Sequence, residues 1–202
     1  FQLMVYGDIE VKNADIIEFQ KKINVDIGVF LDYPTASTKR EDVLKSVNET
    51  IKSCREAKEL IDKNRLWCGP IQGTIYKDLL KKCAKEMEEF HIHPIGSVVP
   101  FLQKYEFSTI IRIIKNVKEI VPPSKPIHLF GAGHPMFFAF AVAMGIDLFD
   151  SASYALFAKE GKYMTVHGTY DIKDLSYLPC SCPVCSQKEP NEMKEEDLAL
   201  HN

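Results

Sequence analysis

The sequence lacks the features of a membrane, secreted or strongly basic protein. Among its 202 residues no apolar run approaches the roughly 20 residues needed to cross a bilayer, and the start lacks the charged segment of a signal peptide. Six cysteines are too few for a disulfide-dense secreted scaffold. Lys and Arg total 25 against 28 Asp and Glu, and a formal net charge of -3 does not suggest a basic nucleic-acid clamp. We therefore expect a soluble, cytoplasmic protein, in which any polyanion would meet a local patch.

The composition that remains is that of a globular domain, with 46% hydrophobic and 26% charged residues. Apolar runs of strand length alternate with stretches that repeat apolar residues at helical spacing, which predicts successive β-α units. Strands are expected at residues 27–31, 66–71, 92–99, 126–130 and 147–149. Helices are expected at residues 14–23, with Asn13 as the N-cap, and at 39–63, 76–90, 107–117, 136–144 and 197–201. The period breaks after residue 150, where residues 151–168 are expected to be mostly turns.

Five or so β-α units fit either an open doubly wound sheet or part of an eight-stranded barrel, and periodicity alone does not choose between them. Polar residues and glycines follow the successive predicted strands, and in a barrel such strand ends converge on the mouth where these folds place their chemistry. The positions concerned are Asp32, Gln72, Gly96, Ser97, Gly131 to Gly133 and Asp150. Their placement favours the barrel.

The six cysteines fall into two groups. Cys180, Cys182 and Cys185 form a C-x-C-x-x-C run, and three thiolates this close can hold one tetrahedral ion. His201 is the expected fourth ligand, and four protein ligands leave no open position, so we predict a structural zinc ion. Free thiols and an iron–sulfur cluster are the alternatives. The other three cysteines are expected to be small buried hydrophobic residues; they are Cys54, Cys68 and Cys83.

Five motifs stand out along the chain: GPIQG at residues 69–73, HLFGAGHP at 128–135, GIDLFDS at 145–151, LPCSCPVC at 178–185 and LALHN at 198–202. Together they resemble the catalytic domain of tRNA-guanine transglycosylases of the archaeal type. The resemblance implies a (β/α)8 TIM barrel with a zinc subdomain, divided here into a barrel portion at residues 1–168 and a zinc-binding subdomain at 169–202. It also implies a transferase that exchanges guanine in tRNA for a 7-deazaguanine base. In the archaeal branch this base is 7-cyano-7-deazaguanine, on the route to archaeosine.

The resemblance assigns the chemistry to Asp150. This residue matches the family's nucleophile, which forms a covalent bond to the ribose while guanine departs, as in retaining glycoside transfer. Without the resemblance, Asp150 would be interpreted as a helix N-cap or a buried carboxylate at a strand end. The neighbouring Asp147 is expected to have a structural role.

The base is expected to bind Asp32 and Gln72, which match the family's base-binding positions. A carboxylate can accept hydrogen bonds from N1–H and the exocyclic amine of guanine, while an amide serves O6. Gly96, Ser97 and Val98 would supply backbone groups at the 7-substituent, and Phe130 would offer a face for stacking. Ser97 stands where the family pattern has glycine.

The sequence departs from the family pattern at its start. In the family an Asp-Ser-Gly-x-Phe-Gln stretch carries a second aspartate, whereas this chain begins at Phe1-Gln2. We therefore expect the first β-α units and that aspartate to be missing here, and these 202 residues alone to be inactive, because a barrel cannot close without its first strands. The alternative function is that of a non-catalytic, transglycosylase-like subunit that binds tRNA. A homodimer and a complex with a partner subunit are both open alternatives for the assembly.

The remaining basic and imidazole side chains carry less information. Ordinary packing or polar roles are expected for His91, His93, His128, His134 and His167. The local positive charges near the zinc region, where the family meets tRNA, would be Lys159 and Lys162.

Overall fold

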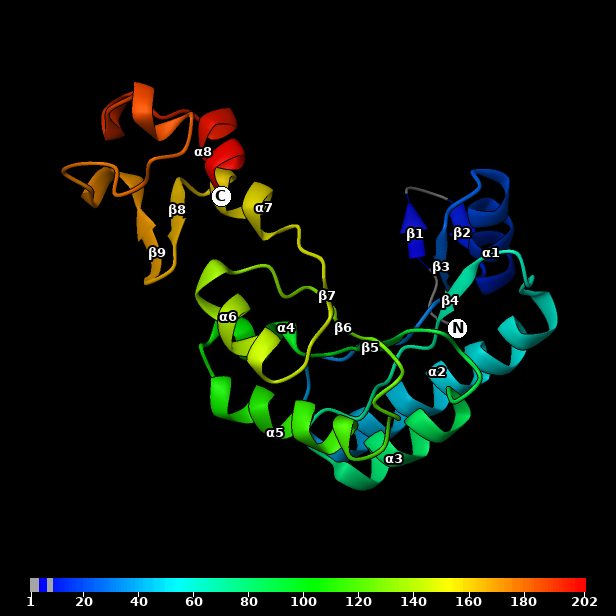
Figure 1. Cartoon of the computed structure of the whole chain (residues 1–202). Helices are drawn as coiled ribbons and strands as arrows, with labels where there is room; N and C mark the ends of the chain where they lie inside the picture. The colour runs from blue at the N-terminus through cyan, green and yellow to red at the C-terminus, as the bar shows by residue number, and fades with distance from the viewer. Residues whose placement is uncertain (1–3, 7–8) are drawn as a thin grey trace. The chain divides into compact units, whose positions relative to one another are not determined.

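The computed structural model describes residues 4–6 and 9–202, with side chains from residue 11 onward, and the chain divides into two compact units (Figure 1). Unit 1 comprises Phe1–Phe130 and Ile146–Leu148, and unit 2 comprises Gly131–Gly145 and Phe149–Asn202. The Phe1-Gln2 stretch of the family pattern lies outside the described residues. None of the described helices combines the length and the apolar character that a membrane span requires.

Unit 1 is an alternation of strands and helices, as the sequence predicts. Two short strands, β1 (Met4–Tyr6) and β2 (Ile9–Val11), form an antiparallel pair at its start. The elements that follow are α1 (Asn13–Lys22), β3 (Ile27–Val29), α2 (Arg40–Leu60), β4 (Leu66–Cys68), α3 (Lys77–Glu86), β5 (His93–Ile95), α4 (Val99–Gln103), α5 (Phe107–Lys118) and β6 (Ile127–Leu129). The strand β7 (Leu148–Phe149) lies at the boundary between the units.

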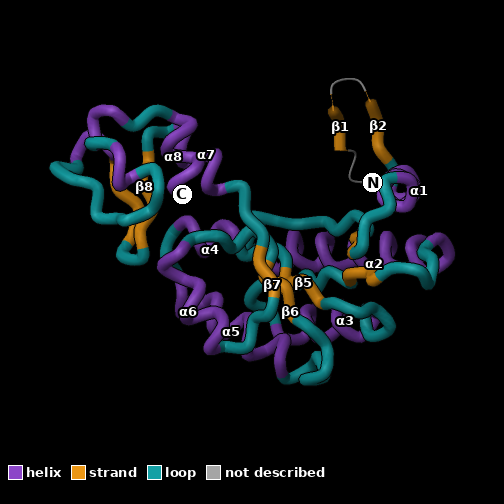
Figure 2. The backbone as a smooth tube through the Cα atoms, turned by 45° about the horizontal axis from the view of Figure 1, so that its top comes forward, coloured by secondary structure: helices purple, strands orange, loops and turns teal. Residues whose placement is uncertain are grey.

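The strands β3 to β6 of unit 1 run parallel and neighbour one another in chain order. Strand β3 pairs with β4 and β5 pairs with β6, while single bridges from Cys68 to Ile92 and from Ile71 to Ile95 connect the two pairs. Strand β7 follows beside β6. Figure 2 shows these short strands as orange segments followed by purple helices. A doubly wound sheet reverses its strand order at a switch point. The described order has no such reversal, so the α/β arrangement is consistent with a TIM-barrel-type fold.

The helices of unit 1 bury one apolar stripe each. In α2 the buried stripe includes Val43, Val47, Ile51 and Cys54, at the helical spacing that predicts it. Strand β4 contributes Trp67, whose fully buried ring lies so close to β3 that a β-carbon at position 28 would approach it to 2.5 Å. The prediction that Cys54, Cys68 and Cys83 are buried is confirmed.

The prediction that Asn13 caps the first helix is wrong, because its side chain makes tertiary rather than local hydrogen bonds. Asn13 is the first residue of α1 itself, and its amide donates to the carbonyl of Ser53 at 2.9 Å and accepts from the backbone N–H of Leu31 at 3.0 Å. The residue is buried, and a buried amide needs partners on both of its polar atoms. The N-cap is Lys12, whose N–H donates to Asp15 at 2.9 Å.

Unit 2 contains more regular structure than the sequence predicts. The expected helices near residues 136–144 and 197–201 are present as α6 (Pro135–Ala143) and α8 (Glu195–His201). Residues 151–168, expected to be turns, form α7 (Ser153–Lys159) and most of a hairpin of β8 (Lys162–Thr165) and β9 (Gly168–Asp171). The short turns η1 (Ile172–Asp174), η2 (Cys185–Gln187) and η3 (Pro190–Glu192) follow. A small core holds them together, formed by Ala158, Tyr163, Ile172, Cys185 and Leu198.

Candidate functional site

Three of the predicted base-binding residues form one hydrogen-bonded network in unit 1. Asp32 follows β3 and accepts a 2.5 Å hydrogen bond from the Nε2 atom of Gln72, which follows Ile71 and its bridge to β5. The hydroxyl of Ser97 lies 2.7 Å from Oε1 of Gln72 and accepts from the backbone N–H of Thr35 at 2.9 Å. Since parallel strands bring their carboxyl ends to one edge, residues 40 and 25 positions apart in sequence meet there.

The carboxamide of Gln72 is held from several sides. Its side chain is fully buried, and its backbone N–H donates to the thiol of Cys83 at 3.3 Å. Gly96 packs directly on it, because a β-carbon at position 96 would lie 2.1 Å from Nε2. Glycine at this position is therefore a steric requirement of the network. The sequence analysis did not place Cys83 or Thr35 at the base site. Their contacts with Gln72 and Ser97 are visible only in the folded chain.

The surroundings of Asp32 favour the protonated, neutral form of its carboxyl group. Burial raises its pKa above the usual range, and the hydrogen bond from Gln72 offsets part of that shift. The residue also lines a cleft of about 210 Å³ whose walls include Asn13, Tyr33, Lys52 and Glu56. The lining of this cleft does not include Gln72 or Ser97. A ligand that donates hydrogen bonds to Asp32 would lower its pKa and favour the charged form.

The other predicted base contacts lie in unit 1 near the ends of β5 and β6. Val98 is fully buried at the start of α4. Phe130 is half-buried and meets His128 edge to face, with ring centroids 4.8 Å apart. Its backbone N–H donates to Ile95 at 3.3 Å, which places it beside the strand that leads into Gly96.

Asp150 belongs to unit 2, where a glycine-rich loop holds it. One of its carboxylate oxygens accepts from the backbone N–H of Gly131 at 3.1 Å, and the residue is exposed. Gly133 approaches Ser151 so closely that a β-carbon at 133 would lie 1.9 Å from that of Ser151. The loop therefore needs glycine here to reach the segment that carries Asp150.

The two aspartates of this region have different partners. In unit 1 the side chain of Asp147 accepts from the N–H of Ile127 at 2.8 Å, while its own N–H donates to the Ile127 carbonyl at 2.9 Å. These bonds connect the segment before β7 to β6, which confirms the structural role predicted for Asp147.

His134 connects the same glycine-rich loop to the hairpin of unit 2. Its Nδ1 accepts from the N–H of Met136 at 3.2 Å and so caps α6, and its Nε2 lies 2.8 Å from the hydroxyl of Thr169 in β9. A nitrogen that accepts from a backbone amide is unprotonated, so the ring proton is on Nε2. Burial lowers the pKa of His134, in keeping with this neutral form.

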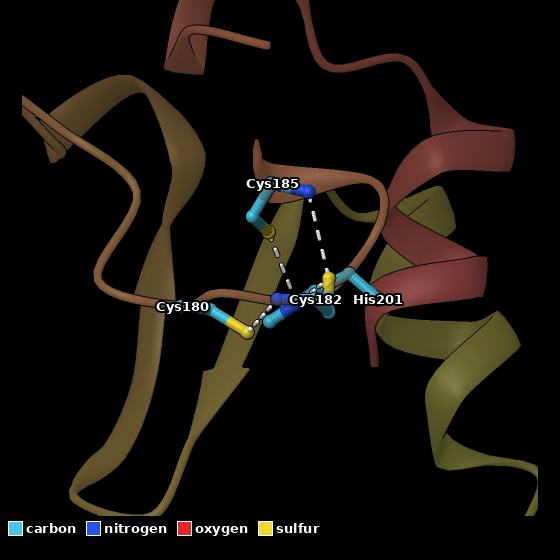
Figure 3. Close-up of side chains that lie close together, drawn as sticks. All are labelled: Cys180, Cys182, Cys185 and His201. Atoms are coloured by element: carbon cyan, nitrogen blue, oxygen red, sulfur yellow. Dashed lines mark hydrogen bonds between the residues drawn. The ribbon is translucent and has the colours of Figure 1, made fainter. Parts of the chain in front are cut away.

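Unit 2 also contains the predicted metal ligands, and the structure brings all four together (Figure 3). Their ligand atoms lie within 4.8 Å of one another. The Nδ1 atom of His201 is 3.7 Å from Sγ of Cys182 and 3.3 Å from Sγ of Cys185. Ligands on a tetrahedron with metal–sulfur bonds of about 2.3 Å are separated by roughly 3.5 to 3.8 Å. The cluster of Cys180, Cys182, Cys185 and His201 can therefore hold one metal ion with little movement.

Groups around the cluster orient its ligands. Nε2 of His201 lies 2.9 Å from the carbonyl of Met164, so it carries the proton and leaves the lone pair of Nδ1 toward the thiols. The ring of Tyr163 stacks on His201 at 3.8 Å, and its hydroxyl lies 3.3 Å from Sγ of Cys185. Burial opposes ionisation of Cys182, but its hydrogen bonds, among them the one that the Cys185 N–H donates to its sulfur, prevail and lower its pKa. No motif or spacing in the sequence pointed to this role of Tyr163.

The family model for queuine tRNA-ribosyltransferase matches residues 1–199 of the chain. The chain belongs to this family. The match includes the Asp32–Gln72–Ser97 network, the Asp150 loop and the three clustered cysteines, whereas His201 lies two residues beyond its end.

Curated relatives from archaea are similar along the whole chain. The tRNA-guanine(15) transglycosylases of Pyrococcus abyssi and Methanocaldococcus jannaschii are 48% and 49% identical over 100% of this chain, and that of Aeropyrum pernix is 43% identical over 100%. The chain spans 36%, 33% and 42% of the length of these relatives, respectively. The resemblance to archaeal transglycosylases predicted from the motifs is confirmed.

Proposed function

We propose that this chain is the catalytic part of a tRNA-guanine transglycosylase that exchanges guanine in tRNA for a 7-deazaguanine base. The observation that carries the proposal is the Asp32–Gln72 pair, in which a carboxylate and a carboxamide lie in hydrogen-bond contact at the ends of neighbouring parallel strands. The family match supports it. As the resemblance to the archaeal type implies, the incoming base in this proposal is 7-cyano-7-deazaguanine.

In this proposal Asp32 accepts from the N1–H and the 2-amino group of the base, and Gln72 donates to O6. The backbone at Gly96, Ser97 and Val98 faces the 7-substituent, and Phe130 stacks on the ring. The burial of Asp32 supports its role, because a buried carboxylate gains more from two donors than an exposed one does.

Asp150 acts as the nucleophile in the first of two displacements and as the leaving group in the second. In the first, a carboxylate oxygen of Asp150 bonds to ribose C1′, and the C1′–N9 bond breaks with its electron pair staying on guanine, which takes up a proton. In the second, the ring nitrogen of the incoming base loses its proton and bonds to C1′, and the bond to Asp150 breaks. The N–H of Gly131 supports this role because it orients the carboxylate through one of its oxygens.

The proposed fold is a (β/α)8 barrel with a zinc subdomain. The in-order parallel strands support the barrel, and the three thiols and one imidazole match the donor set of structural zinc. A zinc ion bound there contributes folding free energy rather than chemistry. The division into residues 1–168 and 169–202 stays a prediction, and tRNA is the proposed macromolecular substrate, met near Lys159 and Lys162.

The experiment that tests the proposal uses Asp150→Ala and Asp150→Asn in the full-length protein. Both should abolish guanine exchange, and neither should form the covalent protein–tRNA adduct that the wild type accumulates when the incoming base is withheld. Asp150→Asn keeps an acceptor for the Gly131 N–H, so loss of activity in both variants separates chemistry from loop structure.

Asp174→Asn is the matched control, because Asp174 is an exposed aspartate of the same unit. It should exchange guanine at the wild-type rate. An adduct that forms normally in Asp150→Ala would identify another nucleophile. Wild-type protein that binds tRNA but gives neither adduct nor exchange would favour the non-catalytic subunit.

A further inference from the structure

Ser97 occupies an unusual backbone position beside the proposed base site. Its φ of 59° lies in the left-handed region that favours glycine, and its side chain is 9% exposed. A serine that is strained in this way needs a compensating interaction. Its hydroxyl provides two, to Thr35 at 2.9 Å and to Gln72 at 2.7 Å.

The direction of each hydrogen bond follows from its partners. The backbone N–H of Thr35 can only donate, so the Ser97 oxygen accepts from it. The single hydroxyl proton of Ser97 is then directed at Gln72, which must present its carbonyl oxygen. At the other end of the carboxamide, the Asp32 carboxylate needs a hydrogen-bond donor, which Nε2 of Gln72 supplies. The contacts with Ser97 and with Asp32 therefore require the same orientation of the Gln72 amide.

The amide can leave this orientation only by a half-turn. It is fully buried, and Gly96 packs against Nε2. A half-turn would direct the carbonyl oxygen of Gln72 at the Asp32 carboxylate and its NH2 group at Ser97. The hydroxyl would then receive two donors and lose its own acceptor, so Ser97 resists the half-turn independently of Asp32.

We propose that Ser97 is a specificity-determining residue, which fixes the polarity of Gln72 so that its NH2 group faces the 6-position of the bound purine. The inference rests on the proposed function, because it concerns the same base site. One N–H of Gln72 serves Asp32, and the second remains for a ligand.

A fixed NH2 group distinguishes two classes of purine. A 6-oxo purine such as guanine presents an acceptor to it, whereas a 6-amino purine presents a second donor. In 2,6-diaminopurine the 2-amino group of guanine is retained, O6 is replaced by an amine, and N1 is an acceptor because it carries no hydrogen. Without the Ser97 hydroxyl, Gln72 could turn and accept from that amine, so the preference for guanine would weaken.

The experiment compares Ser97→Ala and Ser97→Gly with the wild type in the full-length protein. The dissociation constants of guanine and 2,6-diaminopurine are measured by equilibrium dialysis, and the melting temperature checks the fold. Both variants remove the hydroxyl, but only glycine relieves the positive φ. We expect both to reduce the preference for guanine by about fivefold to tenfold, the range for one neutral hydrogen bond. Asp32 is present in all three proteins, so its contribution to the preference for guanine cancels when the proteins are compared.

The outcomes separate this inference from the function on which it rests. If the wild type binds neither base, the proposed function fails. If the wild type prefers guanine and both variants keep that preference within about twofold, Ser97 does not set specificity. If Ser97→Ala loses the preference and Ser97→Gly keeps it, the backbone rather than the hydroxyl is responsible, and the inference is overturned.

Discussion

The polar cluster of unit 1 and the thiol cluster of unit 2 differ in what completes them. In unit 1 the Thr35 N–H, the Ser97 hydroxyl and one N–H of Gln72 each meet a protein acceptor, and the second N–H of Gln72 has none among the described residues. In unit 2 the ligand atoms of Cys180, Cys182, Cys185 and His201 lie within 4.8 Å of one another. The first cluster is stable as a hydrogen-bond network, whereas the second needs a positive ion. We therefore expect different conditions to disrupt the polar cluster and the thiol cluster.

The largest expected effect is on the thiol cluster. Cys182→Ser in the full-length protein should lose the metal and most of the stability of unit 2, because structural zinc contributes roughly 10 kcal/mol to folding. Metal content by mass spectrometry and hydrogen exchange of β8, β9 and α8 measure this. Cys68→Ser is the control; it should keep the metal, since Cys68 lies in β4 of unit 1. Native protein without zinc, and with free thiols in the Cys180–Cys185 run, would contradict the prediction.

Acid should act on unit 1 through His93. Its ring is buried, and within the described chain neither ring nitrogen has a hydrogen-bond partner. Burial and then the charge of Lys125 lower its pKa to about 4. The unfolded value is about 6.5, so the unfolded state binds the extra proton first, and stability present above pH 6.5 is lost as the pH falls toward 4. The loss attributable to His93 should reach about 3 kcal/mol.

Hydrogen exchange of the β5 amides at several pH values measures this loss. His93→Leu should flatten the acid limb, whereas His167→Gln, an exposed residue of the unit 2 hairpin, should leave it unchanged. An unaltered slope in His93→Leu would show that other groups carry the acid sensitivity.

Asp32→Asn tests whether the network of unit 1 also binds the base. The new amide can still accept from Gln72, but it presents an NH2 group to the donors of guanine, so binding should weaken by about 2 kcal/mol. The rate of labelled guanine exchange measures the effect. Asp26→Asn, at the opposite end of β3, should behave as wild type. Normal exchange by Asp32→Asn would remove Asp32 from the base site.

The smallest expected effect concerns the surroundings of the metal. Tyr163→Phe keeps the ring that stacks on His201 but removes the hydroxyl near Cys185. Metal affinity should fall roughly tenfold, as is typical when an outer hydrogen bond to a ligand is lost. Titration against a competing chelator measures this, with the exposed Tyr170→Phe as the matched variant. Equal affinities in the two variants would show that the hydroxyl does not tune the site.

The sequence predicted the elements of unit 1 better than those of unit 2, for a physical reason. Helices such as α2 and α5 bury a long apolar stripe, and that periodicity is visible in the sequence. The hairpin of β8 and β9 has only four residues in each strand, and its core residue Tyr163 packs against Cys185 and His201 from distant positions. Contacts of this kind leave no local pattern.

The same distinction between local patterns and contacts of distant residues applies to the functional sites. The cysteine spacing predicted the cluster that the structure forms, because three of its ligands lie within six residues. Asp32 and Gln72 were found through the family resemblance. The hydroxyl of Ser97 and the amide of Thr35 act through a left-handed backbone residue, and nothing in the spacing of residues reports a dihedral angle.

The buried amide of Asn13 has a consequence for the order of folding. It joins the start of α1 to Leu31 and Ser53, only 18 and 40 residues further along the chain. Short loops of this kind close early and at low entropic cost. We therefore expect the segment from α1 to α2 to act as a folding nucleus, which forms before the strands later in the chain pack against it. Asn13→Ala should then slow refolding more than it accelerates unfolding.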